Sequence, residues 1–265
     1  VARTAGKTFR DRTEAGVADD GNALMQAEFR VLLRSAARPY LAAGLYPYFF
    51  ARGKLAYDPV YVSLLRRGGI ADGARILDLG CGQGLLAAVL IAARRQYEAG
   101  AWPIGWPAPP STIQFYGIEL QERSASWARI ALAGRASVQT GDLRDAKLPD
   151  ADAVFILDVI HFLEPEAQRR VLEQVAHALR AGGTLFMRVA DIAAGLRFGF
   201  TRVADWFSSL MRGQRVPPHH HCSLADWTAM LNSLGFAVEA EPVSAGTPFA
   251  NVLLRAHAGG RPGPP

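Results

Sequence analysis

Cysteine is scarce in this sequence. Only two of the 265 residues are cysteines, Cys81 and Cys222. Two thiols far apart in a chain of this length do not form the disulfide framework of small secreted domains. We therefore expect no structural disulfide and a reducing compartment, the cytoplasm. The first residues, Val1 to Arg3, show no apolar signal core, which favours the same location.

Long apolar runs and basic runs are also missing. No stretch reaches the roughly 18–20 apolar residues that a membrane-spanning helix needs, so no span is expected. The formal net charge is +5, but the basic residues come as scattered pairs such as Arg66–Arg67 and Arg94–Arg95. No basic run is interleaved with aromatic residues, and this argues against a nucleic-acid partner. The sequence gives no indication of the oligomeric state.

A folded core is within reach of this composition, since half of the residues are hydrophobic and 20% are charged. From residue 75 onward, apolar strand-like runs alternate with helical periodicity. This alternation is typical of an α/β domain: a Rossmann-like, seven-stranded, mostly parallel sheet with helices on both faces. The expected strands are Arg75–Leu79, Ile113–Ile118, Ala136–Thr140, Ala153–Leu157, Thr184–Val189, Phe236–Glu241 and Val252–Ala256, and the expected helices are Gln83–Arg95, Glu122–Ala133, Glu166–Leu179 and Ala225–Leu234.

The chain around this alternation divides into further segments. Apolar spacing predicts helices over Leu24–Leu33 and Val60–Leu65, and the last two strands are close enough in sequence to form an antiparallel pair. Two insertions interrupt the pattern. They are the Trp- and Pro-rich Tyr97–Thr112 and the segment Ile192–Cys222, with a helical stretch near Arg202–Met211. We predict a flexible arm over residues 1–20, an N-terminal helical segment or lid over 21–72, a main domain over 73–258 and a disordered tail over 259–265.

The most informative stretch is the glycine-rich loop from Asp78 to Gly84, which follows a buried strand and precedes an apolar helix. Glycine lets a ligand approach the backbone closely. The dinucleotide fingerprint G-x-G-x-x-G would require a glycine at position 85, which is Leu85, whereas the third glycine here is Gly84. The early carboxylate of Asp78 would be poorly placed beside a pyrophosphate and suits a ligand that carries an ammonium group.

The pattern of Asp78, Gly80, Gly82 and Gly84 closely resembles motif I of the class I S-adenosylmethionine-dependent methyltransferases. The resemblance covers residues 73–257 and makes residues 73–258 a methyltransferase domain with S-adenosylmethionine as cofactor. It implies that the loop holds the methionine part, that an acid after the second strand binds the ribose, and that an acid after the third strand contacts the adenine. The cofactor-binding residues implied in this way are Asp78, Gly80, Cys81, Gly82, Gly84, Glu119, Leu120, Asp142, Leu143 and Asp158.

Several other residues allow two interpretations. His161, three residues after Asp158, is a candidate general base, or it packs against or caps the next helix. The run His219–Cys222 invites a metal, but consecutive side chains diverge and no partner ligand is apparent, so we expect no metal site. Instead, Ser223 is placed to cap the following helix. Cys81 is a small loop filler or a thiol activated by a helix N-terminus.

The aromatic segment Tyr46–Tyr57 also has two interpretations. It either closes over the cofactor and acceptor, with a cation near a carboxylate, or docks as a helix on the domain edge. In the first case its side chains, together with histidines of the later insertion, contact the substrate. The candidates for the substrate pocket are Tyr46, Arg52, Lys54, His220 and His221.

Three functions compete at this point. The first is methyl transfer to a small, aromatic or apolar acceptor, because the segments near Leu231–Phe236 and Ser244–Asn251 resemble those of bacterial small-molecule methyltransferases. More distantly, they resemble enzymes that accompany aryl-polyene and related polyketide pigment synthesis. The second is an RNA or protein methyltransferase, and the third is a non-catalytic nucleotide-binding module. The identity of the acceptor and the atom that is methylated do not follow from the sequence.

Overall fold

The computed structural model describes residues 29–195, 220–244 and 247–259. The predicted arm over residues 1–20, the start of the helix predicted from Leu24, the helical stretch Arg202–Met211, His219 and residues 260–265 lie outside the described residues.

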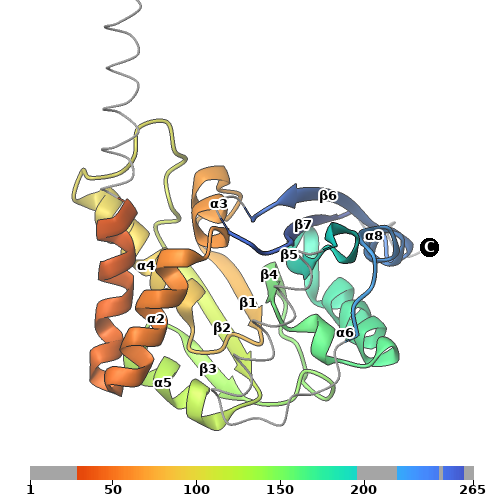
Figure 1. The fold of residues 1–265 in the computed structure, drawn as a ribbon, viewed down its shortest axis with the longest axis horizontal. Coiled ribbons are helices and arrows are strands. Elements are labelled where there is room, and N and C mark those ends of the chain that lie inside the picture. Colours follow the sequence, from red (N-terminus) through yellow and green to blue (C-terminus); the bar gives the residue numbers. More distant parts are fainter. Residues whose placement is uncertain (1–28, 196–219, 245–246, 260–265) are drawn as a thin grey trace, which may run out of the picture.

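A single seven-stranded sheet forms the centre of the described fold (Figure 1). Its strand order is β3-β2-β1-β4-β5-β7-β6. The first five strands pair in parallel, and β7 lies antiparallel between β5 and β6. The predicted mostly parallel sheet and its antiparallel last pair are therefore confirmed. The strands are β1 (Ala74–Leu79), β2 (Ile113–Glu119), β3 (Ser137–Thr140), β4 (Ala151–Leu157), β5 (Leu179–Ala190), β6 (Phe236–Pro242) and β7 (Asn251–Ala258).

Both faces of the sheet are buried, and alternate residues of each strand go to opposite faces. In β4, Phe155 packs into one hydrophobic cluster while Val154 and Ile156 pack into the other. The first cluster contains side chains of α4 (Leu85–Glu98) and α5 (Glu122–Leu132), and the second contains those of α6 (Pro165–Ala178) and α8 (Leu224–Ser233). Helices therefore cover both faces, as the alternation of strands and helices predicts.

An N-terminal helical segment precedes the sheet and packs beside α5 (Figure 1). Residues 29–37 are helical, past the predicted end at Leu33, and a 3-10 turn η1 (Arg38–Ala43) begins next to Pro39. Two helices follow, α2 (Leu45–Tyr57) and α3 (Val60–Arg67). The short connection Asp58–Pro59 turns the chain between them and carries both residues to the carboxyl ends of the sheet strands.

From β1 onward, the largest differences from the predicted element boundaries are at the end of α4 and at the start of β5. The helix α4 continues to Glu98, three residues past the predicted end at Arg95. The strand β5 begins at Leu179, which the apolar periodicity assigned to the preceding helix. Leu179 pairs with Ala151 across an irregular register, and this non-local pairing cannot be read from the local pattern. A 3-10 turn η2 (Ile160–Phe162) follows β4, and another, η3 (Ile192–Ala194), follows β5.

The local devices that the sequence indicates are present. Ser223 caps α8 in a capping box with Asp226. Cys81 and Cys222 are both free thiols. The Trp- and Pro-rich insertion forms no helix beyond Glu98, and its Trp106 ring packs against Phe29 of the N-terminal helix at 6.0 Å. No helix in the described part of the chain combines the length and the apolar character that crossing a bilayer requires.

Candidate functional site

A cavity of about 850 Å³ opens at the carboxyl ends of β1, β2 and β4, where ligands bind in open α/β sheets. It brings together most of the residues that the sequence singles out. Gly84, Tyr46, Arg52 and His221 do not line it. The predicted residues in its wall are Lys54, Asp78, Gly80, Cys81, Gly82, Glu119, Leu120, Asp142, Leu143, Asp158, His161 and His220.

The glycine loop is shaped by close contacts on both sides. Gly80 and Gly82 both have positive φ, at 76° and 57°. A Cβ on Gly80 would lie 2.3 Å from Val159 Cγ2, so only glycine fits there. Around Gly82, by contrast, a Cβ would meet no atom within 4 Å, which leaves its backbone open on the cavity side. The loop therefore offers bare backbone to a ligand at Gly82.

Gly84 lies at the start of α4 and, unlike Gly80 and Gly82, does not line the cavity. It caps α4 in the left-handed conformation, with φ of 73°. A Cβ there would lie 2.8 Å from Leu132 Cδ1 and 3.3 Å from Ala128 Cβ, both on α5. Its small size therefore lets two helices approach each other, and its backbone does not reach the cavity.

Asp78 is the most unusual carboxylate in the cavity. It is only 3% exposed, and among the described residues no donor bonds to its carboxylate. Burial, together with the nearby Glu119, raises the pKa of Asp78 to about 8. A buried carboxyl group of this kind gains most from a cationic ligand, since a positive charge favours its ionised form.

Two further acids lie along the cavity wall. The Glu119 carboxylate accepts hydrogen bonds of 2.9 Å from the backbone N–H groups of Gly82 and Gln121. It is thereby fixed between the glycine loop and the start of α5. Asp142 accepts a hydrogen bond from Arg144 Nε at 3.0 Å, and the bonds from Arg144 lower the pKa of Asp142. Both acids are positioned to accept hydrogen bonds from hydroxyl or amino groups.

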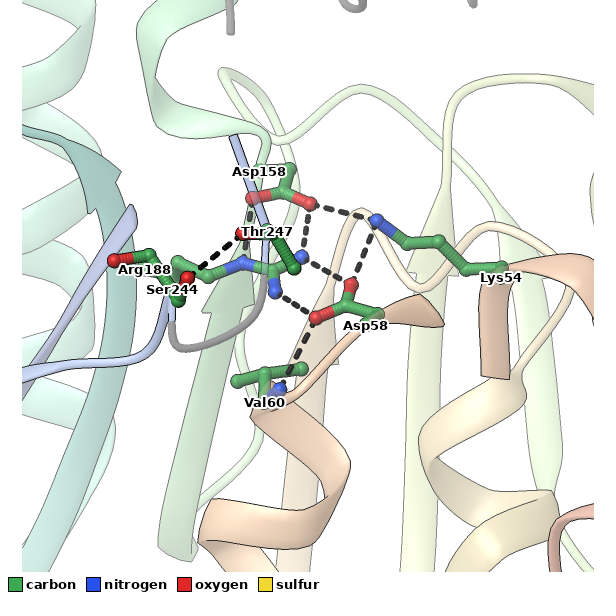
Figure 2. A network of polar contacts seen from close by, with 7 residues as sticks. All are labelled: Lys54, Asp58, Val60, Asp158, Arg188, Ser244 and Thr247. Atoms are coloured by element: carbon green, nitrogen blue, oxygen red, sulfur yellow. Dashed lines mark hydrogen bonds and ion pairs between the residues drawn. The ribbon is translucent and has the colours of Figure 1, made fainter. Parts of the chain in front are cut away.

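A cluster of four charged side chains closes the other end of the cavity (Figure 2). We call Lys54, Asp58, Asp158 and Arg188 the ion cluster. Arg188 on β5 is 1% exposed and contacts both carboxylates, with Nε 2.6 Å from Asp158 Oδ1 and Nη2 2.9 Å from Asp58 Oδ2. Lys54 Nζ lies 2.8 Å from Asp58 Oδ2 and 3.1 Å from Asp158 Oδ2. The ion cluster thus joins α2 and the connection after it to the ends of β4 and β5.

The charges within the ion cluster balance. Burial raises the pKa of Asp58, but Arg188 and Lys54 outweigh it and bring the pKa to about 2. The same two cations hold the pKa of Asp158 below its ordinary range. Asp158 also has φ of 61°, a left-handed conformation that Asp tolerates better than most residues. Both carboxylates stay ionised at neutral pH, and their lowered pKa values make them weak bases.

His161 lies beside the ion cluster. It is 6% exposed and lines the cavity, and its ring stacks on that of His221 at 5.0 Å. The backbone of His220 is fixed from both sides, because its N–H donates to His161 O and its carbonyl accepts from Gln168 Nε2, each at 2.8 Å. The ring of His161 is therefore packed against His221, and the backbone of His220 is held by its hydrogen bonds to His161 and Gln168.

Asp58, Tyr61 and Arg188 are among the cavity residues that the sequence pattern did not single out. Asp58 and Arg188 are 130 positions apart, and no local motif connects them. The sequence contains only a weak indication that Arg188 belongs to the site. An arginine within the apolar strand Leu185–Ala190 has to be buried, and a buried arginine requires carboxylate partners.

Comparison with known proteins agrees with this geometry. Residues 77–185 match a family model described as a methyltransferase domain. The carboxy-S-adenosyl-L-methionine synthase of Shigella boydii serotype 4 (strain Sb227) is 23% identical over 209 residues, which cover 73% of this chain and 81% of that protein.

Solved structures share the fold. The magnesium protoporphyrin IX methyltransferase of Synechocystis PCC 6803, solved with bound SAH, matches with a TM-score of 0.53 at 20% identity, covering 78% of this chain and 83% of that one. The mitomycin 7-O-methyltransferase matches with a TM-score of 0.54 at 20% identity, covering 80% of this chain and 56% of that one. The strand order, the glycine loop and these matches support a class I S-adenosylmethionine-dependent methyltransferase, with S-adenosylmethionine as the methyl donor.

Proposed function

We propose that the protein methylates a small, aromatic or apolar acceptor held between the glycine loop and the N-terminal segment. One observation carries the proposal: a single cavity joins the loop Asp78–Gly82 to an aromatic wall. Part of that wall comes from α2 and from the chain between α2 and α3. Its aromatic members are Phe50, Tyr57, Tyr61, Phe162 and Phe249. The volume of about 850 Å³ suits two small molecules side by side, since pockets of about 300–1,000 Å³ hold drug-sized ligands.

The lining residues fit a cationic cofactor. Among the described residues of the wall, six carboxylates face four basic side chains, and Asp78 has no cation of its own. We propose that Asp78 takes the ammonium group of S-adenosylmethionine, Glu119 the ribose and Asp142 the adenine edge. When bound, this cofactor supplies a methyl group already activated on a sulfonium. The protein then has to position the acceptor and exclude water.

His161 is the proposed general base for an acidic acceptor, because it is the buried imidazole of the cavity wall nearest the ion cluster. The lowered pKa values of Asp58 and Asp158 support this assignment, since Arg188 and Lys54 hold both carboxylates and leave them weak bases. Lys54 is the proposed cation near an acceptor oxygen. In this arrangement Arg188 is a positioning residue that keeps the ion cluster in place.

A product assay tests the proposal. The protein is incubated with S-adenosylmethionine labelled in the methyl group and with one of three acceptor sources: a small-metabolite extract, tRNA or histones. We expect label in the small-metabolite fraction, about a hundredfold less of it with His161→Gln, and no change with His177→Gln on the exposed side of α6. Label confined to tRNA or histones would contradict the proposal.

A second activity is favoured by the named relative. The matching protein of Shigella boydii is a carboxy-S-adenosyl-L-methionine synthase, and 73% of this chain aligns with it. In that case the product is a carboxylated form of the cofactor, and no acceptor becomes labelled. Mass spectrometry of the cofactor pool after the same incubation distinguishes the two activities.

A further inference from the structure

Tyr61, the second residue of α3, presents a buried phenol to the cavity. Its side chain is 6% exposed, and no described residue hydrogen-bonds to its hydroxyl. Tyr40 shows the ordinary arrangement by contrast, because its buried hydroxyl donates a hydrogen bond to Gln83 O at 2.7 Å. Buried hydroxyls are nearly always hydrogen-bonded, so an open one in a cavity wall indicates a place for a ligand.

Tyr61 lines the same cavity as the ion cluster and Asp78. It is within electrostatic reach of the ion cluster, through Asp58, Asp158 and Arg188, and also of Asp78. Burial and then Asp58 raise the pKa of Tyr61 well above its ordinary value. The phenol therefore stays protonated at neutral pH and donates a hydrogen bond to an acceptor oxygen.

The cofactor brings a suitable oxygen to this place. In the proposed function the ammonium group at its amino-acid end binds Asp78, and a carboxylate is attached to the same carbon atom. That carboxylate therefore lies close to Asp78 and needs donors of its own. The neighbouring acids do not repel it strongly, because Arg188 and Lys54 neutralise Asp58 and Asp158.

We propose that Tyr61 Oη donates a hydrogen bond to the carboxylate at the amino-acid end of S-adenosylmethionine. The N-terminal segment would then bind the cofactor directly, as well as form a wall for the acceptor. This inference rests on the proposed function, because it takes Asp78 as the site of the ammonium group.

Calorimetric titration with two ligands tests the inference. One ligand is S-adenosylhomocysteine, and the other is its decarboxylated analogue, which keeps the amine but lacks the carboxylate. We expect Tyr61→Phe to weaken S-adenosylhomocysteine binding about tenfold or more, since hydrogen bonds to charged groups are strong, and to leave the analogue unchanged. Tyr116→Phe is the matched control, since the Tyr116 hydroxyl contacts Gln139 outside the cavity.

Unchanged binding of the analogue also shows that the Tyr61→Phe variant is folded. Equal losses for both ligands, or no loss for S-adenosylhomocysteine, would overturn the inference, and the second result would assign the phenol to the methyl acceptor or to no ligand. Failure of the unaltered protein to bind S-adenosylhomocysteine would instead overturn the proposed function.

Discussion

Gly82 and Gly84 look equivalent in the sequence, yet they meet different surroundings. Both have positive φ, so alanine at either position costs about 1–2 kcal/mol of backbone strain. A methyl group on Gly82 would stand in open space on the cavity side, whereas one on Gly84 would press into Leu132 and Ala128. The two substitutions therefore separate ligand binding from packing.

We expect Gly82→Ala to weaken S-adenosylhomocysteine binding at least tenfold while costing little stability beyond the strain. Gly84→Ala should destabilise the protein by a further 1–3 kcal/mol or so, from overpacking, and change the affinity less. Calorimetry and urea denaturation of both variants check this. The opposite ranking, with Gly84→Ala the worse binder and the more stable protein, would contradict these placements.

Asp78 predicts a pH dependence of stability. Its pKa is about 8 in the folded protein and about 4 in an unfolded chain. Between these values the folded state holds a proton that the unfolded state lacks, so the free energy of unfolding falls as pH rises from 4 to 8. The loss is complete above pH 8. Asparagine does not titrate in this range. The Asp78→Asn variant therefore lacks this contribution to the decrease of the free energy of unfolding with pH.

The expected result is that Asp78→Asn has the higher Tm at pH 8.5, by about 2–4 °C for each kcal/mol regained, and nearly the same Tm at pH 4. Thermal melts across this range check it, with Asp150→Asn at an exposed site as the control. A variant that loses Tm at pH 8.5 would show that the Asp78 carboxylate is stabilised within the protein.

Residues that act through distant partners set the limit of what the sequence predicts. Asp78, Glu119, Asp142 and Asp158 lie in or just after the last residues of strands, so a strand prediction already carries them to one edge. Arg188 sits within an apolar strand, and its partner Asp58 precedes the sheet entirely. Their pairing depends on how the N-terminal segment docks, and no periodicity encodes that.

At the scale of elements, the ion cluster connects α2 to the sheet. Arg188 makes contacts to both carboxylates, and removing it would leave the Asp58 side chain, which is 8% exposed, and the partly buried Asp158 without their main partner. Breaking a buried ion pair on one side costs about 3–5 kcal/mol. We expect Arg188→Met to be destabilised by about this amount at pH 7.

The destabilisation should shrink in acid. Arg188 and Lys54 together lower the pKa of Asp58 to about 2 and that of Asp158 further, so the stabilising effect of these ion pairs is present above pH 4 and is lost as pH falls towards 2. Urea denaturation at pH 7 and pH 2 measures the difference, and Arg180→Met at a surface pair with Asp152 is the control. An equal cost at both pH values would mean that Arg188 stabilises by packing alone.

The secondary structure elements were largely predictable because their signals are local. All seven strands follow from apolar runs, and the cap of α8 follows from Ser223 and Asp226. The start of β5 at Leu179 was missed, since it depends on pairing with Ala151 in another strand. The approach of Trp106 to Phe29 is of the same kind, because contacts between distant segments leave no periodic trace.

At the scale of the whole molecule, the N-terminal segment and the sheet share one cavity. Six carboxylates line its described wall, and three of them, Asp78, Glu119 and Glu164, have no ion-pair partner among the described residues, which favours a ligand with a positive charge. The glycine loop opens bare backbone towards the same space. The central claim is that this cavity binds S-adenosylmethionine through the loop from Asp78 to Gly82.

Calorimetric titration of S-adenosylmethionine into the protein tests that claim most directly, with NAD titrated in parallel. The account predicts saturable binding of one S-adenosylmethionine per chain, at least tenfold weaker binding to Gly82→Ala, and no binding of NAD. Absence of S-adenosylmethionine binding by the folded, unaltered protein, or tighter binding of NAD, would contradict it.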